Sequence, residues 1–363
     1  MKAGILLVTG IILFLTGTAL AEDCILCHGG MWGKANYGMH ARGVGSCNMC
    51  HTMHNSQDGT LVDPDHPGGN QWLLVAGTPS DVCLNCHAGF IGNVFGDDPL
   101  APPTEIGGGN FTFLLEDNLN DGYNGALSPI PGYKAGHSIL APSKGVGPDG
   151  TLATSPGGSF PSTQLGCTSC HDPHGNTNFR MLYGVGSIQN ESFYFNNPAP
   201  DGFGLSIYHG QERADRHTAY NGGFSAWCGN CHGDFHAQTG KFIHPAGQAM
   251  GTAIAAIYNT YNGTSDPVGG DFTTAYLPAV PFEDPGHDYT STAGASGSSK
   301  VMCLTCHRAH ASSAPDAGRW DFNVTFLKDD GVESGSYAIP NPYADDRQRS
   351  LCNKCHRKDE FDS

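Results

Sequence analysis

Hydrophobic positions along this chain seldom follow the regular spacing of an amphipathic helix or a half-buried strand. The clearest helical pattern runs from Gln248 to Tyr261 and predicts one buried face, made by Met250, Ile254, Ile257, Tyr258 and Tyr261. Two short apolar runs, Phe111–Leu115 and Ser192–Phe195, are bounded by Gly, Asn or Pro and are typical of strands. The interval between Cys86 and Cys167 has many Pro-Gly, Gly-Gly and Asp-Gly turns, which predict a loop-rich insertion. We therefore expect short helices, little sheet and no marked domain boundary.

The first 21 residues contain the longest apolar run of the chain. Lys2 precedes an apolar core from Gly4 to Leu15, and Ala19-Leu20-Ala21 has the small-x-small form of a cleavage site, so residues 1–21 are predicted to be a secretory signal peptide. A permanent membrane anchor is the alternative, but the run is short for a spanning helix and a cysteine motif begins three residues after the predicted cut. We expect residues 22–363 to form one exported domain without a membrane span.

All fourteen cysteines belong to seven copies of Cys-x-x-Cys-His, in which two thiols can add to the vinyl groups of haem and the histidine can ligate its iron. The cysteines are Cys24, Cys27, Cys47, Cys50, Cys83, Cys86, Cys167, Cys170, Cys228, Cys231, Cys303, Cys306, Cys352 and Cys355. The histidines are His28, His51, His87, His171, His232, His307 and His356. A zinc knuckle or a redox dithiol also uses Cys-x-x-Cys, but neither needs a histidine after every second cysteine. The chain is therefore predicted to bind seven covalent haem c groups with their iron.

Glycine and proline supply 51 and 23 of the 363 residues, whereas charged residues make up only 14%. Such a composition is typical of loop-rich or disordered chains, because few apolar side chains remain to form a core. Seven porphyrins would supply the missing apolar core, so we expect a multihaem cytochrome c fold, mostly coil with short helices and little sheet, wrapped around its haems. The formal net charge of −16 excludes nucleic acid as a natural partner.

The second axial ligand of each iron separates an electron carrier from an enzyme. Eleven histidines lie outside the motifs, enough for seven bis-histidine haems with four to spare: His40, His54, His66, His137, His174, His209, His217, His236, His244, His287 and His310. A reductase would more naturally show a haem without a sixth ligand or a motif that ends in lysine, and neither is visible. The pattern favours an electron-transfer protein, with a reductase of small oxyanions as the alternative.

Several motifs are followed closely by a second histidine. The pairs are His51/His54, His171/His174, His307/His310 and, with one more residue between them, His232/His236. Side chains three or four residues apart lie on one face of a helix, whereas the two axial ligands of one iron approach from opposite sides of the porphyrin. We therefore expect each second histidine to ligate a neighbouring haem. Haems cross-linked in this way would lie almost edge to edge, and electrons would hop along the row.

Several segments resemble the extracellular cytochrome nanowire family, the OmcS-type multihaem c-type cytochromes. They are Cys50-His51-Thr52-Met53-His54-Asn55-Ser56, Cys170-His171-Asp172-Pro173-His174-Gly175, His244-Pro245-Ala246-Gly247, Cys306-His307-Arg308-Ala309-His310-Ala311 and Leu351-Cys352-Asn353-Lys354-Cys355-His356. The resemblance runs in order from His40 to Lys358 and includes Trp227-Cys228. It implies a coil-rich fold around a continuous haem stack, bis-histidine ligation and a structural homopolymer.

The resemblance also implies a set of distal ligands. It matches histidines near the haems of the family to His40, His137, His174, His236, His244 and His310. It matches His54 to a histidine that crosses a subunit boundary, to the haem held by Cys303, Cys306 and His307 in the next copy. The family pattern lacks the motif from Cys24 to His28, so this chain would bind an additional N-terminal haem. Surface or propionate-contacting roles are expected for His66 and His287, and the candidates to ligate the additional haem are His209 and His217.

These expectations describe a secreted heptahaem c-type cytochrome at the outer cell surface or in the extracellular space, which conducts electrons and is not an enzyme. Its expected partners are copies of itself in a filament, other cytochromes, and extracellular electron acceptors such as metal oxides. A monomeric carrier in the periplasm or on the outer surface is the alternative within electron transfer. A multihaem reductase is the alternative from another class.

Overall fold

The computed structural model describes residues 47–57, 59–88, 94–96, 107–118, 130–205, 212–235, 245–263 and 269–357. The α-helices are α2 (Cys47–Cys50), α3 (Pro79–His87), α4 (Gly132–Ala135), α5 (Cys167–Cys170), α6 (Phe224–Cys228), α7 (Gly251–Thr260) and α8 (Cys303–Cys306). The 3₁₀ helices are η1 (Gln71–Leu73), η2 (Phe111–Asn118), η3 (Pro142–Lys144), η4 (Ser162–Gln164), η5 (Phe179–Met181), η7 (Gly233–Phe235), η8 (Phe272–Thr274), η9 (Pro315–Ala317), η10 (Leu327–Asp329) and η11 (Leu351–Lys354). The strands are β1 (Ser56–Gln57), β2 (Thr60–Leu61), β3 (Ile188–Gln189), β4 (Phe193–Tyr194), β5 (Asp201–Phe203) and β6 (Ala219–Gly222).

The strands pair only locally, as three two-stranded antiparallel ribbons: β1 with β2, β3 with β4, and β5 with β6. Strand β4 lies within the run Ser192–Phe195 that was predicted to be a strand. The prediction of coil with short helices and little sheet is confirmed. Within the described part of the chain, every helix is too short or too polar to cross a membrane.

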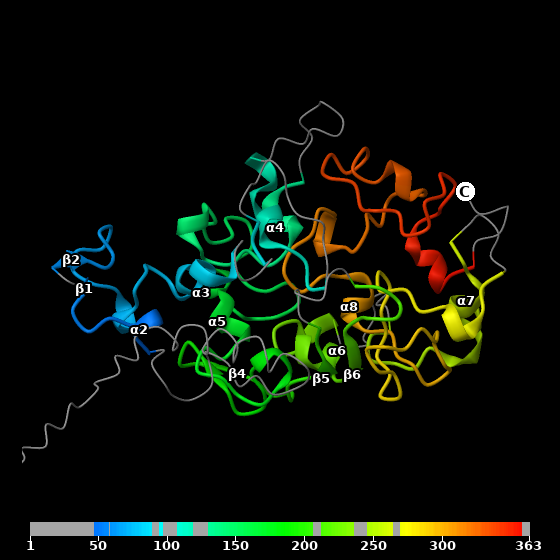
Figure 1. Ribbon diagram of the computed structural model, residues 1–363, viewed down its shortest axis with the longest axis horizontal. Coiled ribbons are helices and arrows are strands. Elements are labelled where there is room, and N and C mark those ends of the chain that lie inside the picture. Colours follow the sequence, from blue (N-terminus) through cyan, green and yellow to red (C-terminus); the bar gives the residue numbers. More distant parts are fainter. Residues whose placement is uncertain are drawn as a thin grey trace, which may run out of the picture.

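The helices that contain cysteines of the haem motifs follow one another along the molecule. Figure 1 shows α2, α3, α5, α6 and α8 in chain order along the long axis, with the C-terminal residues at the far end from α2. Helix α3 packs against α5, and α6 packs against α8. The chain therefore brings motifs that are far apart in sequence into adjacent positions.

Among the described residues, apolar side chains are buried in three separate clusters instead of one core. The largest surrounds α7 and contains Tyr258 and Trp320. A second contains Phe113 and Ile139 from the long insertion, and a third contains Phe224. Small separate clusters are what a chain forms when it wraps a row of large apolar groups.

The predicted helix at Gln248–Tyr261 begins three residues later than expected. Ala249 forms a β-bridge with Lys300, and Gly251 has a φ of +71°, so the helix begins only at Gly251. The predicted apolar face is confirmed, with buried Met250, Tyr258 and Tyr261 and partly buried Ile254 and Ile257. Local backbone pairing therefore overrides the helical pattern at the N-terminal end.

The prediction of a strand at Phe111–Leu115 is wrong, because these residues form the first part of η2. Phe111, Phe113 and Leu114 are all buried, and α4 packs against η2. A short continuous apolar run is ambiguous between a strand and a helix that is buried on all sides. The described part of the insertion consists of short helices joined by loops, and it contains much of the second buried cluster.

Candidate haem-binding site

Six of the seven Cys-x-x-Cys-His motifs lie in the described residues, whereas Cys24, Cys27 and His28 lie outside them. In five of the six, the backbone N–H of the histidine donates to the backbone carbonyl oxygen of the first cysteine, at 2.7 to 3.0 Å. The sixth motif, Cys83 to His87, forms the C-terminal half of the regular helix α3. One turn of backbone therefore holds two sulfur atoms and one imidazole in a fixed arrangement.

Three motifs share a second feature, which we call the histidine clamp. In each, the motif histidine has its Nδ1 within hydrogen-bonding distance of a backbone carbonyl oxygen farther along the chain. The pairs are His51 with Trp72 at 2.9 Å, His171 with Arg180 at 2.8 Å, and His307 with Asp316 at 2.8 Å. Because a carbonyl oxygen only accepts, Nδ1 must carry the hydrogen. The lone pair of Nε2 then remains for a metal, and the ring orientation is set by the clamp.

The clamp carbonyls come from pairs of residues with left-handed backbone. Both members of each pair have φ between 51° and 59°: Trp72 and Leu73, Arg180 and Met181, Asp316 and Ala317. Left-handed backbone is unfavourable for side chains with a Cβ, so three copies indicate a conformation that the surrounding structure enforces. Sequence reasoning missed these residues, because no glycine or asparagine marks the turns.

Three pairs of histidine rings face each other at closely similar distances. The ring centroids are 6.3 Å apart for His51 and His174, 6.4 Å for His171 and His310, and 6.0 Å for His137 and His232. A metal–imidazole bond is about 2 Å long and the ring centre lies about 1 Å farther out, so two imidazoles on opposite sides of one iron have centroids about 6 Å apart. The three pairs therefore fit bis-histidine haem, and each joins a motif histidine to one of the predicted distal ligands.

The protonation of these side chains also suits haem c. Burial lowers the pKa of His310 to about 3, with a further effect from His171, and burial lowers the pKa of His137. Burial therefore favours the neutral imidazole at both positions, which is the form that ligates iron. Burial raises the pKa of the Cys170 and Cys306 thiols to about 12. A zinc site needs thiolates, whereas the thioether of haem c has no charge, so burial favours haem.

Cysteines of neighbouring motifs lie close to one another, in chain order. The first cysteines are neighbours in two junctions, Cys83 with Cys167 and Cys228 with Cys303. The second cysteines are neighbours in the three other junctions: Cys50 with Cys86, Cys170 with Cys231, and Cys306 with Cys355. The two kinds of junction alternate along the row. Six described motifs thus form one continuous line.

The remaining histidines differ in what they contact. His54 is exposed near the end of the row, and His40, His209, His236 and His244 lie outside the described residues. His217 has both ring nitrogens at carbonyl oxygens, 2.9 Å from that of Thr218 and 2.8 Å from that of Ser291, so neither nitrogen is available to the additional haem.

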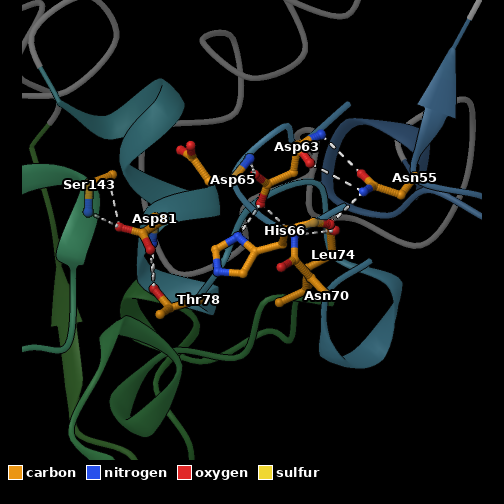
Figure 2. A network of polar contacts seen from close by, with 9 residues as sticks. All are labelled: Asn55, Asp63, Asp65, His66, Asn70, Leu74, Thr78, Asp81 and Ser143. Carbon is orange, nitrogen blue, oxygen red and sulfur yellow. Dashed lines mark hydrogen bonds and ion pairs between the residues drawn. The ribbon is translucent and has the colours of Figure 1, made fainter. Parts of the chain in front are cut away.

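His66 and His287 also make polar contacts within the chain. Figure 2 shows His66 within a polar network, in which its Nδ1 lies 2.9 Å from the carboxylate of Asp63. His287 Nε2 lies 2.6 Å from the carbonyl oxygen of Ala293. The Ala293 contact occupies Nε2 of His287, whereas the Asp63 contact of His66 involves only Nδ1, as in the histidine clamp. The surface or propionate-contacting roles expected for both histidines stay predictions.

Comparison with known proteins gives concordant results. Residues 161–191 match the family model described as a doubled CXXCH motif. The chain is 32% identical to the C-type cytochrome OmcS of Geobacter sulfurreducens, over 91% of this chain and 96% of that protein. Two solved structures from the same organism, an outer membrane cytochrome S filament and the OmcS nanowires, share 30% identity, cover 88% of this chain, and have TM-scores of 0.75 and 0.72. Both are matched over 100% of their own chain. The chain therefore belongs to the OmcS family of c-type cytochromes.

Proposed function

We propose that this chain conducts electrons outside the cell along a row of seven haems, as one subunit of a filament built from copies of itself. The observation that carries the proposal is the row of motifs, with three histidine pairs at the spacing of bis-histidine iron. Membership of a family of electron-transfer cytochromes supports the proposal, as does the similarity to two filament structures.

The described geometry supports a specific assignment of distal ligands. In this assignment His174 serves the iron of His51, His310 serves that of His171, and His137 serves that of His232. His40, His54, His236 and His244 are the candidates for the irons of His87, His307 and His356, and the distal ligand of the additional haem stays open. Bound haem supplies an iron that accepts and releases one electron. At the three motifs with paired histidines, the two imidazoles would occupy both axial positions of the iron and leave none open to a substrate, which disfavours a reductase there.

The proposed path follows the junctions between neighbouring motifs. The cysteines of successive motifs are close enough to interact, and haem edges attached to them would be similarly close. Helix pairs α3–α5 and α6–α8 hold two of the junctions rigidly by direct packing. The role of the polypeptide is therefore to fix the distances between haems and to keep each imidazole neutral and oriented.

The filament part of the proposal rests on His54. Its neighbour His51 faces His174, whereas the exposed His54 lies near the end of the described row. We assign His54 to the iron of His307 in the next copy, as the family resemblance implies. Iron coordination across the boundary would link polymer assembly to haem loading.

The proposal also includes an export signal and a seventh haem. Residues 1–21 would be removed on export, and Cys24, Cys27 and His28 would attach the additional haem. Other cytochromes and metal oxides are the proposed electron partners at the cell surface. Intact mass should show the mature chain with seven haems, and six haems with free thiols at Cys24 and Cys27 would contradict this part.

The decisive experiment replaces His54 with Ala and compares it with His66→Ala, a matched change of another exposed histidine. His54→Ala should keep every haem attached, leave one haem per chain five-coordinate, and shorten or abolish filaments in negative-stain images. His66→Ala should keep low-spin spectra and normal filaments. Filaments of normal length in His54→Ala would contradict the intersubunit assignment. Stoichiometric cyanide binding by the native protein would instead favour the reductase.

A further inference from the structure

The last haem motif contains a buried positive charge. Lys354 lies between Cys352 and Cys355 and is only 1% exposed. Its Nζ donates to the carbonyl oxygens of Tyr258 at 2.8 Å, Tyr261 at 3.1 Å and Ala275 at 3.1 Å. Three carbonyl acceptors require three N–H donors, and among the forms of a lysine only the ammonium has three. Lys354 is therefore charged in this position.

No carboxylate among the described residues forms an ion pair with this ammonium group. Besides the three carbonyl oxygens, Nζ contacts the face of the Tyr258 ring, whose centroid lies 4.2 Å away. A haem attached at Cys355 would therefore lie in the field of a cation that no described carboxylate pairs.

A motif nearer the other end of the row has a buried charge of opposite sign. Asp81 in α3 lies two residues before Cys83 and is 4% exposed. Figure 2 shows its carboxylate between Thr78 and Ser143. It accepts hydrogen bonds from Ser143 N at 3.0 Å, Ser143 Oγ at 2.6 Å and Thr78 Oγ at 2.7 Å. These donors are neutral, so they solvate the carboxylate without cancelling its charge.

We infer that Asp81 and Lys354 tune two haems of the row in opposite directions, Asp81 favouring the oxidised haem at Cys83–His87 and Lys354 favouring the reduced haem at Cys352–His356. The inference rests on the proposed function, because it requires haem at both motifs. Reduction adds one negative charge to a haem, which a nearby cation stabilises and a nearby anion destabilises. At an effective dielectric constant of about 20, a unit charge about 12 Å from the iron changes the ratio of reduced to oxidised haem about tenfold.

The two opposite charges give each subunit one favourable direction of electron transfer. An electron moves downhill from the Cys83 haem toward the Cys352 haem and is held longest beside Lys354. In a filament the next transfer crosses to another copy. Because Lys354 stabilises the reduced haem at Cys352–His356, transfer across the subunit boundary would be the slow step of conduction.

The test is a spectroelectrochemical titration of the complete haem-loaded protein, with variants that remove each charge. Asp81→Asn preserves the local hydrogen bonds, because the Asn oxygen can accept from Ser143 while its Nδ2 donates to Thr78 Oγ. The Thr78 hydroxyl can then donate to Leu140 O, which is already 3.2 Å away. Lys354→Met keeps the length of the side chain and removes its charge, and Lys354→Arg keeps the charge. Exposed Lys134 and Asp346 provide the matched controls Lys134→Met and Asp346→Asn.

In Asp81→Asn, the midpoint potential of one haem should rise by about 59 mV, so that its ratio of reduced to oxidised haem rises about tenfold at a fixed applied potential. In Lys354→Met, the midpoint potential of one haem should fall by a similar amount. Lys354→Arg, which keeps the charge, should give the native curve. If each substitution only loosened the structure, it would admit water to the haem beside it. The potentials of both haems would then shift in the same direction.

Three results would overturn the inference. The potentials of the two haems could shift in the same direction, the Asp81→Asn curve could equal the native one, or Lys354→Met and Lys354→Arg could give equal shifts. The exposed controls should leave the curve unchanged. Failure of the proposed function would appear separately, as missing haem or high-spin iron in the native protein before any charge is changed.

Discussion

Gly136 lies where two predicted distal ligands meet, and Gly136→Ala tests their placement. Its backbone forms an antiparallel bridge with Ala311, and the His137 N–H donates to the His310 carbonyl oxygen at 2.9 Å. The two histidines therefore lie on paired segments, while their rings face His232 and His171 respectively. Gly136 has an extended backbone with φ of 166°, so any effect of a side chain there comes from contact and not from backbone strain.

The size of the effect follows from the space available. A Cβ at Gly136 would overlap the His310 carbonyl oxygen and lie 2.5 Å from the Cα of Ala311, whereas an ordinary contact begins at 3.4 Å, so the segments must separate by at least 0.9 Å. That separation breaks the His137–His310 hydrogen bond and the bond from Ser312 N to Ala135 O. Two lost hydrogen bonds and the strain of overpacking together cost about 3 kcal/mol of unfolding free energy.

The ligands would be affected more than the overall stability. An iron–imidazole bond of about 2 Å does not survive a displacement of nearly half its length. Both His137 and His310 should therefore be lost as ligands, and two haems per chain should become five-coordinate. Absorption and electron paramagnetic resonance spectra measure the high-spin fraction, and pyridine haemochrome analysis checks that every haem is still attached.

Gly147→Ala is the matched control, because no atom lies within 4 Å of the Cβ it would add. It should keep the native spectra and unfolding midpoint. If Gly136→Ala has the same low-spin spectrum as Gly147→Ala, the two segments do not hold the distal ligands as described. High-spin iron equal to one haem would show that only one of the two histidines is a ligand.

Two further predictions concern stability. Tyr258→Phe should lower the free energy of unfolding in guanidinium by about 2 kcal/mol, because the buried hydroxyl donates to Val280 O at 2.8 Å and accepts from Leu277 N at 3.1 Å; an unchanged midpoint would contradict this. Hydrogen bonding by Asn70, 2.7 Å away, holds the pKa of Asp63 below its ordinary value of 3.8. The stability contributed by the Asp63 carboxylate is therefore complete above that value and lost as the pH falls through the lowered pKa. Asp63→Asn should be less stable than the native protein at pH 7, and the difference should shrink as the pH falls through the lowered pKa. A difference that does not change with pH would refute the assignment.

The sequence by itself determined the attachment chemistry and the class of fold. Cys-x-x-Cys-His acts within one helical turn, so its spacing alone is sufficient to predict sulfur and imidazole on the same side of a haem. A chain with many glycines and prolines and few charged residues is expected to form coil around large apolar groups. The short strand at Ser192–Phe195 was also predictable, because the paired strand is adjacent in sequence.

Only the tertiary structure decided which histidines face each other and which groups surround them. His137 and His232 are separated by 94 intervening residues, and their approach depends on how the insertion packs against the segment after α8. No sequence signal marked the left-handed pairs, the helical state of Phe111–Leu115, or the burial of Asp81 and Lys354. The physical reason is that these features depend on contacts between distant segments, and a one-dimensional pattern records only the preferences of neighbouring residues.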